Sequence, residues 1–280
     1  MAVVPRLIID QSVRDPLASS DSRAPGTQVW RDLDGVVSAL CLRRDGQRSI
    51  EFPGIARFFV RDDRSCVTAV PHADCRLDEV VDTYRRAAVP VLLQALGTEV
   101  LHASAVHTAH GVIGLCAVAR TGKSTIAFAL ARRGYRIWAD DALAVELSSD
   151  PVRTIPLPFE VRLRPSAAAY FDSRGFAPEP PTARPASDDG AQPLSALVVL
   201  RRRSGAPLTL RQIPPARAFA ALLPHAYCFS LQELDDKRRI IERYLDLARR
   251  VPVYEIEFQP DFESLPAVLD ALERLATRPS

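Results

Sequence analysis

Residues 117–124 have the spacing of a nucleotide phosphate-binding loop. The segment reads Ala-Val-Ala-Arg-Thr-Gly-Lys-Ser and fits the pattern A/GxxxxGK(S/T) between a predicted strand and a predicted helix. In such loops backbone N–H groups and a helix N-terminus surround phosphate oxygens, a lysine reaches the terminal phosphates, and the serine hydroxyl binds Mg²⁺. The sequence therefore predicts a phosphate site whose nucleotide-binding residues are Ala119, Arg120, Thr121, Gly122, Lys123, Ser124 and Thr125.

Two departures from the usual loop, and one alternative, bear on this interpretation. Ala117 replaces the usual first glycine, and Arg120 is bulky enough either to cover the phosphates or to block them. The alternative is a Gly-Lys-Ser sequence that occurs by chance at a helix start, where such residues are ordinary turn and cap residues. Composition weakens this alternative, because 34 of the 36 basic residues are arginines and only Lys123 and Lys237 are lysines. A lysine at the place where phosphate binding needs a compact ammonium favours the functional interpretation.

An acidic pair follows the next apolar run. Asp140 and Asp141 lie 17 and 18 residues after Lys123, a gap that one helix and one strand would fill. One carboxylate would hold Mg²⁺ and the other would accept a proton from an attacking hydroxyl; the residues alone do not say which does which. An Asp-Asp pair by itself is more often a solvated turn, but its place after a strand and near the loop favours a site.

Three histidines, His102, His107 and His110, precede the loop. Their spacings of five and three residues, in a region of predicted strand and turn, do not match a metal site. A lone histidine is usually structural, and the residues alone do not distinguish His102 from the other two.

The elements that would position these residues alternate between strand and helix, so the predicted fold class is α/β. A strand over 111–118, a helix over 124–134 and a strand over 135–140 predict a parallel sheet with right-handed crossovers. The other expected elements are a strand at 142–147 that pairs as a hairpin with the strand at 135–140, a strand pair at 194–202 and 207–213, an amphipathic helix at 231–249, a strand at 251–258 and a helix at 262–276.

The first 98 residues have a different organisation. Short apolar runs separated by turn formers predict a small, mainly antiparallel sheet with strands over 35–44, 49–54, 55–63 and 66–70. Apolar residues at helical spacing over 77–96 predict a helix that Pro90 kinks or breaks. We therefore expect two units: residues 1–98, with the strand-rich sheet and a connecting helix, and residues 99–280, with the phosphate loop.

Composition and charge narrow the classes of function. The 280 residues carry a net charge of only +2, and the few aromatic residues are not interleaved with the basic ones, which argues against a nucleic-acid partner. No apolar run is long enough for a membrane helix or a signal peptide, so we expect a cytoplasmic protein without a membrane partner. Five scattered cysteines without a CxxC pair argue against a disulfide framework and a zinc site.

Taken together, these segments resemble the HPr kinase/phosphorylase superfamily. The closer resemblance is to its shorter bacterial relatives, the HPr-kinase-like serine kinases found with ribosomally made peptides such as lasso peptides. Residues 101–105 (LHASA) are similar to the family's histidine segment, the Gly-Lys-Ser loop places its lysine 21 residues after His102, and the end of 132–141 (RRGYRIWADD) is similar to the acidic signature. The resemblance is specific over about 101–146 and looser from there to the C-terminus.

The resemblance implies a P-loop core like that of phosphoenolpyruvate carboxykinase and transfer of phosphate from ATP–Mg²⁺ to a serine hydroxyl. It also implies that one residue of the acidic pair is the general base, that His102 supports it, and that Glu160 corresponds to a metal-binding glutamate. The glycine-containing motif that flanks this glutamate in the family is absent, so reverse phosphorolysis is not expected. The arginines at 201–203 would contact phosphate, as a downstream arginine does in the family, or form a solvated strand end, which is the commoner role of a charge run.

The sequence thus predicts an ATP- and Mg²⁺-dependent kinase that phosphorylates a serine of a peptide or small protein, with a ribosomal precursor peptide as the expected acceptor. The expected catalytic residues are His102, Lys123, Asp140 and Asp141, and the expected metal ligands are Ser124, Asp141 and Glu160. Two alternatives stay open: a catalytically weak nucleotide-binding regulator in which Arg120 blocks turnover, and a small-molecule kinase on the same core. The helix at 231–249 would allow a homo-oligomer, although its apolar face is more simply explained as core.

Overall fold

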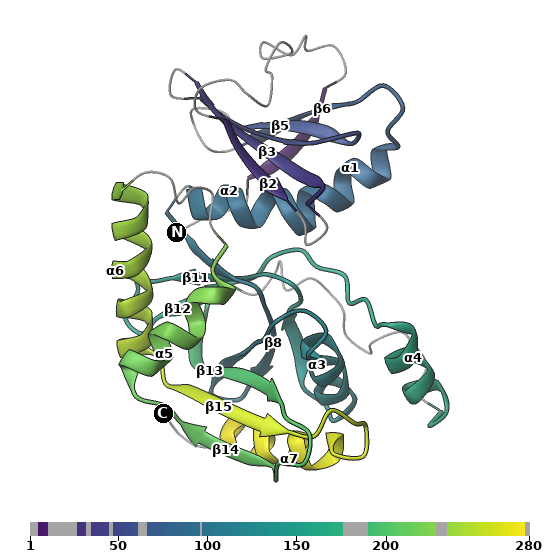
Figure 1. Cartoon of the computed structure of the whole chain (residues 1–280), viewed down its shortest axis with the longest axis vertical. Helices are drawn as coiled ribbons and strands as arrows, with labels where there is room; N and C mark the ends of the chain where they lie inside the picture. Colours follow the sequence, from purple (N-terminus) through teal and green to yellow (C-terminus); the bar gives the residue numbers. More distant parts are fainter. Residues whose placement is uncertain are drawn as a thin grey trace. The chain divides into compact units, whose positions relative to one another are not determined.

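The computed structural model divides the chain into two compact units, residues 1–97 with 228–231, and residues 98–227 with 232–280 (Figure 1). The residues that the structure describes are 5–10, 27–31, 35–44, 47–60, 66–95, 97–175, 190–227 and 234–277. Among the helices of these ranges, none has both the length and the apolar composition needed to cross a bilayer.

The N-terminal unit is built on a six-stranded sheet in the order β1-β6-β5-β4-β3-β2. Neighbouring strands are antiparallel except for β1 and β6, which run parallel, so the predicted mainly antiparallel sheet is confirmed. Cys41, Ile50, Phe58 and Ala69 are paired in register and form a buried row across four strands, so they share the face of the sheet that is covered. The strands are β1 (Arg6–Ile9), β2 (Thr27–Arg31), β3 (Val37–Arg44), β4 (Gln47–Phe52), β5 (Ala56–Val60) and β6 (Cys66–Pro71).

The helical segment after this sheet continues through Pro90 without a break. α1 (Leu77–Thr83) leads through the π-helical turn Tyr84–Ala88 into α2 (Val89–Ala95). The N–H of Val89 donates to the carbonyl of Tyr84, five residues earlier, so the turn before the proline is wider than in an α-helix. A proline has no N–H and its ring clashes with the carbonyl four residues before it, and the wider turn accommodates both effects.

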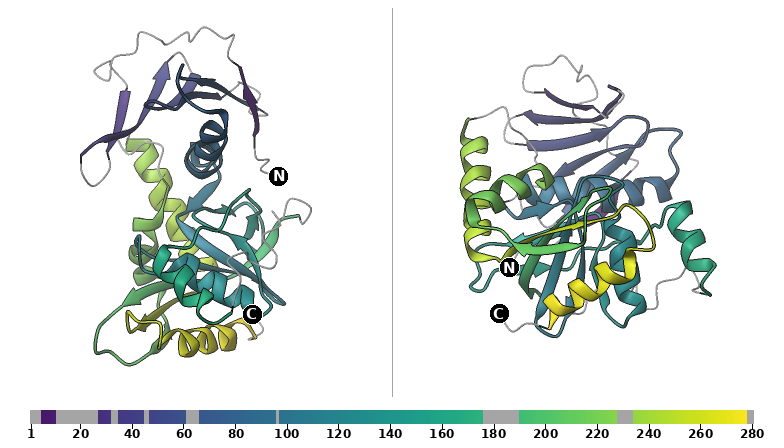
Figure 2. Two further views of the ribbon diagram at one scale, coloured as in Figure 1. Left: turned by 90° about the vertical axis from the view of Figure 1, so that its right-hand side faces the viewer. Right: turned by 60° about the horizontal axis from the view of Figure 1, so that its bottom comes forward.

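The C-terminal unit contains a mixed sheet in the order β10-β8-β9-β13-β12-β11-β7, with β15 next to β13 and β14 next to β15 (Figures 1 and 2). β13 runs parallel to β9 and to β15, and the other pairs are antiparallel. The mixed α/β architecture agrees with the predicted class. Its strands are β7 (Glu99–Leu101), β8 (Ala103–Thr108), β9 (Gly111–Cys116), β10 (Arg136–Ala139), β11 (Leu143–Glu146), β12 (Arg153–Ile155), β13 (Gln192–Arg202), β14 (Thr209–Gln212) and β15 (Val253–Phe258). Its α-helices are α3 (Lys123–Arg132), α4 (Pro165–Asp172), α5 (Pro215–Leu222), α6 (Leu234–Arg250) and α7 (Leu265–Ala276).

The prediction that the strands before and after the phosphate-loop helix are parallel neighbours is wrong in one respect. β9 and β10 run in the same direction, but β8 lies between them and is antiparallel to both. β8 and β9 are joined by a two-residue turn, and strands joined so closely pair as a hairpin. The helix after β9 therefore crosses over β8 before the chain returns as β10.

Two other predicted pairings are also wrong. β11 pairs with β12 and β7 and not with β10. β14 does not pair with β13, because β15 lies between them and bonds to both. Val253, Ile256 and Phe258 of β15 are buried, and a strand with apolar residues on both faces belongs inside a sheet, even where this separates strands that are neighbours in sequence.

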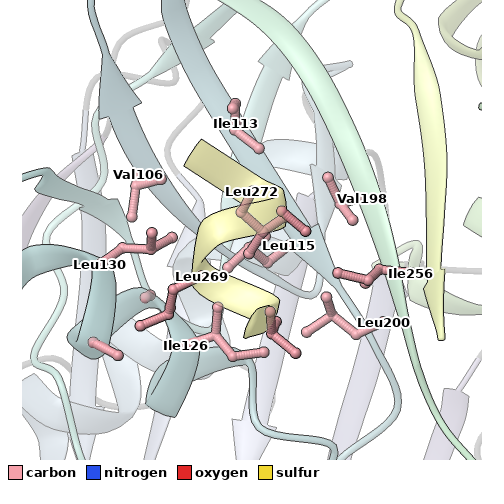
Figure 3. Close-up of a cluster of buried hydrophobic side chains, with 14 of the residues drawn as sticks. Val106, Ile113, Leu115, Ile126, Leu130, Val198, Leu200, Ile256, Leu269 and Leu272 are labelled. Carbon is pink, nitrogen blue, oxygen red and sulfur yellow. The ribbon is translucent and has the colours of Figure 1, made fainter. Parts of the chain in front are cut away.

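The core of the C-terminal unit lies between this sheet and helices α3 and α7. Figure 3 shows side chains of both helices packed toward apolar side chains of β9, β13 and β15. Burying each such leucine or isoleucine contributes about 1.5–3 kcal/mol. This packing fixes the start of α3, and with it the phosphate loop, at the end of β9. The core residues labelled in Figure 3 are Val106, Ile113, Leu115, Ile126, Leu130, Val198, Leu200, Ile256, Leu269 and Leu272.

Gly114, in the middle of β9, is a position where a side chain has no space. A Cβ there would lie 2.7 Å from Cδ2 of both Leu143 and Leu197. We expect Gly114→Ala to lower the free energy of unfolding by about 1–3 kcal/mol, because overpacking forces neighbours off their rotamers. Gly190→Ala is the matched control, since a Cβ there meets nothing within 4 Å. Urea denaturation measures both, and equal stabilities for the two variants would contradict the packing argument.

Candidate active site

The predicted phosphate loop joins the end of β9 to the first residue of α3. Within the loop, the N–H of Thr121 donates to the carbonyl of Val118 (3.3 Å). Arg120 and Gly122 have positive φ angles of 69° and 109°. Left-handed residues within such a turn allow successive N–H groups to converge on an anion. The first amides of α3 have no acceptor within the helix and add to the same site. Ala117 is not among the described residues with positive φ, so a glycine is not required there.

Arg120 holds an exposed side chain on a left-handed backbone. This conformation costs a non-glycine residue about 1–2 kcal/mol, whereas glycine adopts it freely but loses about 0.5–1 kcal/mol more in chain entropy. We expect Arg120→Gly to keep the wild-type free energy of unfolding or to raise it by up to about 1 kcal/mol.

Arg120→Val tests the same position in the opposite direction. A β-branched residue is disfavoured at positive φ, so this variant should lose about 1 kcal/mol or more relative to wild type. Urea denaturation compares the three proteins. A glycine variant that is less stable than the valine variant would show that the backbone here is not left-handed in solution.

Lys123 is buried at the start of α3, with 6% of its surface exposed. Its Nζ donates to the carbonyl of Ala117 (2.9 Å) and to Nε2 of His102 (3.1 Å). Burial lowers the pKa of this ammonium, while the charges of Asp141, Cys116 and Asp140 act in the opposite direction. Two acceptors thus hold the lysine side chain at the start of α3, beside the loop.

His102 connects Lys123 to the acidic pair. Its Nδ1 lies 3.1 Å from the backbone carbonyl of Asp141, and because a carbonyl only accepts, Nδ1 carries the proton and Nε2 is the acceptor for Lys123. Burial and the nearby ammonium both lower the pKa of His102, which favours this neutral form. The structure therefore distinguishes His102 from His107, which stacks on Trp138 at 5.8 Å between ring centroids, and from exposed His110.

Asp140 is the buried member of the acidic pair, 7% exposed. Its Oδ1 accepts two hydroxyl bonds, from Ser124 of the phosphate loop (2.8 Å) and from Ser104 of β8 (2.5 Å). Burial raises the pKa of this carboxyl, and the two serine hydroxyls offset part of that rise. Ser104 lies outside the motifs that the sequence shows; the signal available was a serine near the start of β8, two residues after His102.

Asp141 has a left-handed backbone, with φ of 64°. Its carbonyl accepts from Nδ1 of His102 and from the hydroxyl of Tyr227 (3.2 Å). The charge of its carboxylate favours the charged form of Lys123. The predicted catalytic residues His102, Lys123, Asp140 and Asp141 are thus brought together within one unit.

The structure does not bring Glu160 to this group. Its side chain is 70% exposed and pairs with Arg162 at 3.0 Å. Among the described residues, no three His, Cys, Asp or Glu side chains are grouped so as to hold a metal ion, so the assignment of Glu160 stays a prediction.

A Mg²⁺ bound together with a nucleotide needs few protein ligands, because phosphate oxygens and water supply the rest. Ser124 and Asp140 fit this requirement, because the hydroxyl oxygen of Ser124 and Oδ1 of Asp140, both oxygen ligands of the kind that Mg²⁺ prefers, lie 2.8 Å apart at the phosphate loop. The donor set is therefore suitable for Mg²⁺ carried in on phosphate.

The three arginines at the end of β13 have different surroundings. Arg201 pairs with Glu255 (2.6 Å) and Arg203 with Glu257 (3.4 Å), on the neighbouring strand β15. Nη2 of Arg202 lies 3.2 Å from where a Cβ on Gly122 would be, so this guanidinium is beside the phosphate loop. All three side chains are exposed, as expected for a strand end, but Arg202 alone of the three is placed next to a glycine of the loop.

Comparison with protein-family models gives no match, and comparison with curated proteins gives none either. Among solved structures, the chain is similar to the Hpr(Ser) kinase/phosphatase from Coxiella burnetii, with 12% sequence identity and a TM-score of 0.33. The similarity covers 63% of this chain and 94% of that one. A TM-score this low does not establish a common fold, so the function rests on the geometry of the site itself.

Proposed function

We propose that this protein is an ATP- and Mg²⁺-dependent kinase that transfers the γ-phosphoryl group to a serine hydroxyl of a peptide or small protein. The observation that carries the proposal is the contact of the phosphate-loop serine, Ser124, with the buried carboxylate of Asp140, next to the Lys123–His102 pair. A structural turn would have no need for a buried lysine, a buried aspartate and a left-handed loop at one sheet edge.

Lys123 is the residue that would neutralise charge on the transferred group. Phosphoryl transfer depends mainly on positioning and on electrostatic stabilisation of the equatorial oxygens. When a nucleotide binds, the ammonium of Lys123 would exchange the neutral carbonyl of Ala117 for a charged phosphate oxygen. A hydrogen bond to a charged acceptor is the stronger of the two. Arg202 would add a second cation at the same phosphates.

In the acidic pair, one aspartate would bind Mg²⁺ and the other would be the general base. Asp140 shares a hydrogen bond with Ser124, so we assign Mg²⁺ to Ser124 and Asp140, in place of the Asp141 assignment made from sequence. When bound, Mg²⁺ would supply charge neutralisation between the phosphates. Asp141 is then the base: its carboxylate accepts the serine proton while the serine oxygen bonds to phosphorus and the bond from phosphorus to the ADP oxygen breaks.

The serine acceptor and the HPr-kinase-like family are supported by the resemblance over 101–146. Within that family the same resemblance favours a ribosomal precursor peptide as the acceptor. A catalytically weak regulator is the second candidate, because Arg120 is exposed at the loop on a backbone that favours glycine.

Incubation with Mg-ATP and serine-containing peptides, including those encoded beside this gene, tests the proposal by intact mass. We expect one added phosphoryl group on a serine peptide and none on its serine-to-alanine counterpart. ATP binding without transfer, even in Arg120→Gly, would favour the regulator. Transfer to free metabolites but not to peptides would indicate a small-molecule kinase.

A further inference from the structure

We propose that Tyr227 is a positioning residue of this site. Its hydroxyl and the imidazole of His102 would together hold the backbone carbonyl of Asp141, and this clamp would fix both the left-handed conformation of Asp141 and the tautomer of His102. The effect on turnover rests on the proposed function, whereas the effect on His102 does not.

The clamp consists of two donors on one acceptor. The hydroxyl of Tyr227 lies 3.2 Å and Nδ1 of His102 lies 3.1 Å from the carbonyl oxygen of Asp141. A carbonyl oxygen has two lone pairs and can accept both bonds. Asp141 needs such support, because its φ of 64° is a conformation that a non-glycine residue keeps only when its surroundings hold it.

Tyr227 reaches the clamp because its chain segment pairs with the strand that leads to His102. The N–H of Tyr227 donates to the carbonyl of Val100 (2.9 Å), and the N–H of His102 donates to the carbonyl of His225 (2.7 Å). Leu101 and Ala226 form the antiparallel bridge between these two bonds. The backbone positions of Tyr227 and His102 are thus fixed by the same short ladder.

The two side chains of the clamp also contact each other. The rings of His102 and Tyr227 meet edge to face, with 6.1 Å between centroids and 73° between planes. His225, which begins the segment, is 6% exposed, and burial together with Lys123, His102 and Arg201 lowers its pKa to about 4. It is therefore neutral at pH 7 and leaves Lys123 as the cation next to His102.

The clamp has a consequence for Lys123. With its proton held on Nδ1 by the Asp141 carbonyl, His102 presents Nε2 as an acceptor to the ammonium. The bond that Tyr227 makes to the same carbonyl fixes the position of that carbonyl, and so the orientation of the imidazole. Tyr227 acts through His102 and Asp141, and its hydroxyl takes no part in the transfer of the phosphoryl group.

Nitrogen NMR of the imidazoles tests the clamp without any activity assay. The chain has five histidines, and the resonances of His102 are identified by their loss in His102→Asn. At pH 7.5 we expect wild type to show His102 as a single Nδ1–H tautomer, and Tyr227→Phe to show a mixture of tautomers. A His102 that is Nε2–H in wild type, or that is unchanged in Tyr227→Phe, would overturn the proposal.

Steady-state kinetics on the same variant tests the effect on the reaction. Tyr227→Phe keeps the ring and its packing, so we expect kcat to fall about 10- to 100-fold through misplacement of Asp141, with KM for ATP within about twofold of wild type. Tyr254→Phe, which removes a hydroxyl from a partly buried tyrosine of β15, should change neither value. Equal kcat for wild type and Tyr227→Phe would contradict the positioning role, whereas absence of transfer by wild type would refute the proposed function and leave the NMR result valid.

Discussion

Lys123→Ala is expected to reduce phosphoryl transfer at least about 10²–10³-fold, the cost of removing one preorganised charge from the transferred group. The loss should appear in nucleotide binding as well as in kcat, because Lys123 would contact the phosphates in the ground state and in the transition state. The fold should survive, since among the described residues the lysine bonds to the carbonyl of Ala117 and to neutral His102 and to no carboxylate. Transfer rates and the Kd of Mg-ADP measure the effect.

The composition of the chain provides a control for this variant. Lys237, the other lysine, lies exposed on α6, so Lys237→Ala should have wild-type activity and binding. Lys123→Arg should remain impaired, because a planar guanidinium does not fit the space of a compact ammonium between Ala117 and His102. Wild-type turnover in Lys123→Ala would mean that the active site lies elsewhere.

Asp140→Asn is expected to reduce transfer about 10²–10³-fold while leaving the fold as stable as wild type or more stable. The amide oxygen of asparagine can still accept from Ser104 and Ser124, so the local structure should be kept. The negative charge that would hold Mg²⁺ is lost, and the concentration of Mg²⁺ needed for half-maximal rate should rise.

The stability of this variant follows from the direction of the pKa shift. Burial raises the pKa of Asp140 in the folded protein above its unfolded value. This group therefore favours folding most at pH values below its unfolded pKa, and that contribution is lost as pH rises through the folded pKa. At pH values above the unfolded pKa this raised pKa disfavours folding, and asparagine, which does not titrate, removes this cost.

Thermal unfolding and Mg²⁺ titration of Asp140→Asn test both halves of the prediction. Asp270→Asn is the matched control, since Asp270 is 54% exposed and pairs with Arg133 on the surface. It should change neither the Mg²⁺ requirement nor the rate. An unchanged Mg²⁺ requirement in Asp140→Asn would show that Asp140 is not the metal ligand, and a marked loss of stability would show that its charge is needed for folding.

The part of the site that is close in sequence was predictable. The loop before Lys123 and the acidic pair after the next strand follow from local signals, because a strand, a phosphate loop, a helix and a second strand come in order along the chain. The spacing of these motifs along the chain does not predict the order of the strands in the sheet, because β8 lies between β9 and β10, the two strands that α3 connects. The order follows from the two-residue turn between β8 and β9, which makes these two strands pair as a hairpin.

The residues that the sequence reasoning missed are distant in sequence from what they contact. Ser104 is 36 residues before Asp140, and Tyr227 is 86 residues after Asp141. A serine or a tyrosine has no motif that marks such a contact, and only the pairing of 225–227 with 100–102 brings Tyr227 to the site. Arg202 was ambiguous for the same reason, because its distance from Gly122 depends on the register of β13 with β9.

The central claim is that residues 117–124, with Asp140, bind the phosphates of a magnesium nucleotide. Isothermal titration of the full chain with a non-hydrolysable ATP analogue, with and without Mg²⁺, tests it most directly. We expect one site with a Kd in the range of about 1 µM to 1 mM that requires Mg²⁺, is lost in Lys123→Ala and is kept in Lys237→Ala. Absence of binding by wild type, or equal binding by the two lysine variants, would contradict the claim.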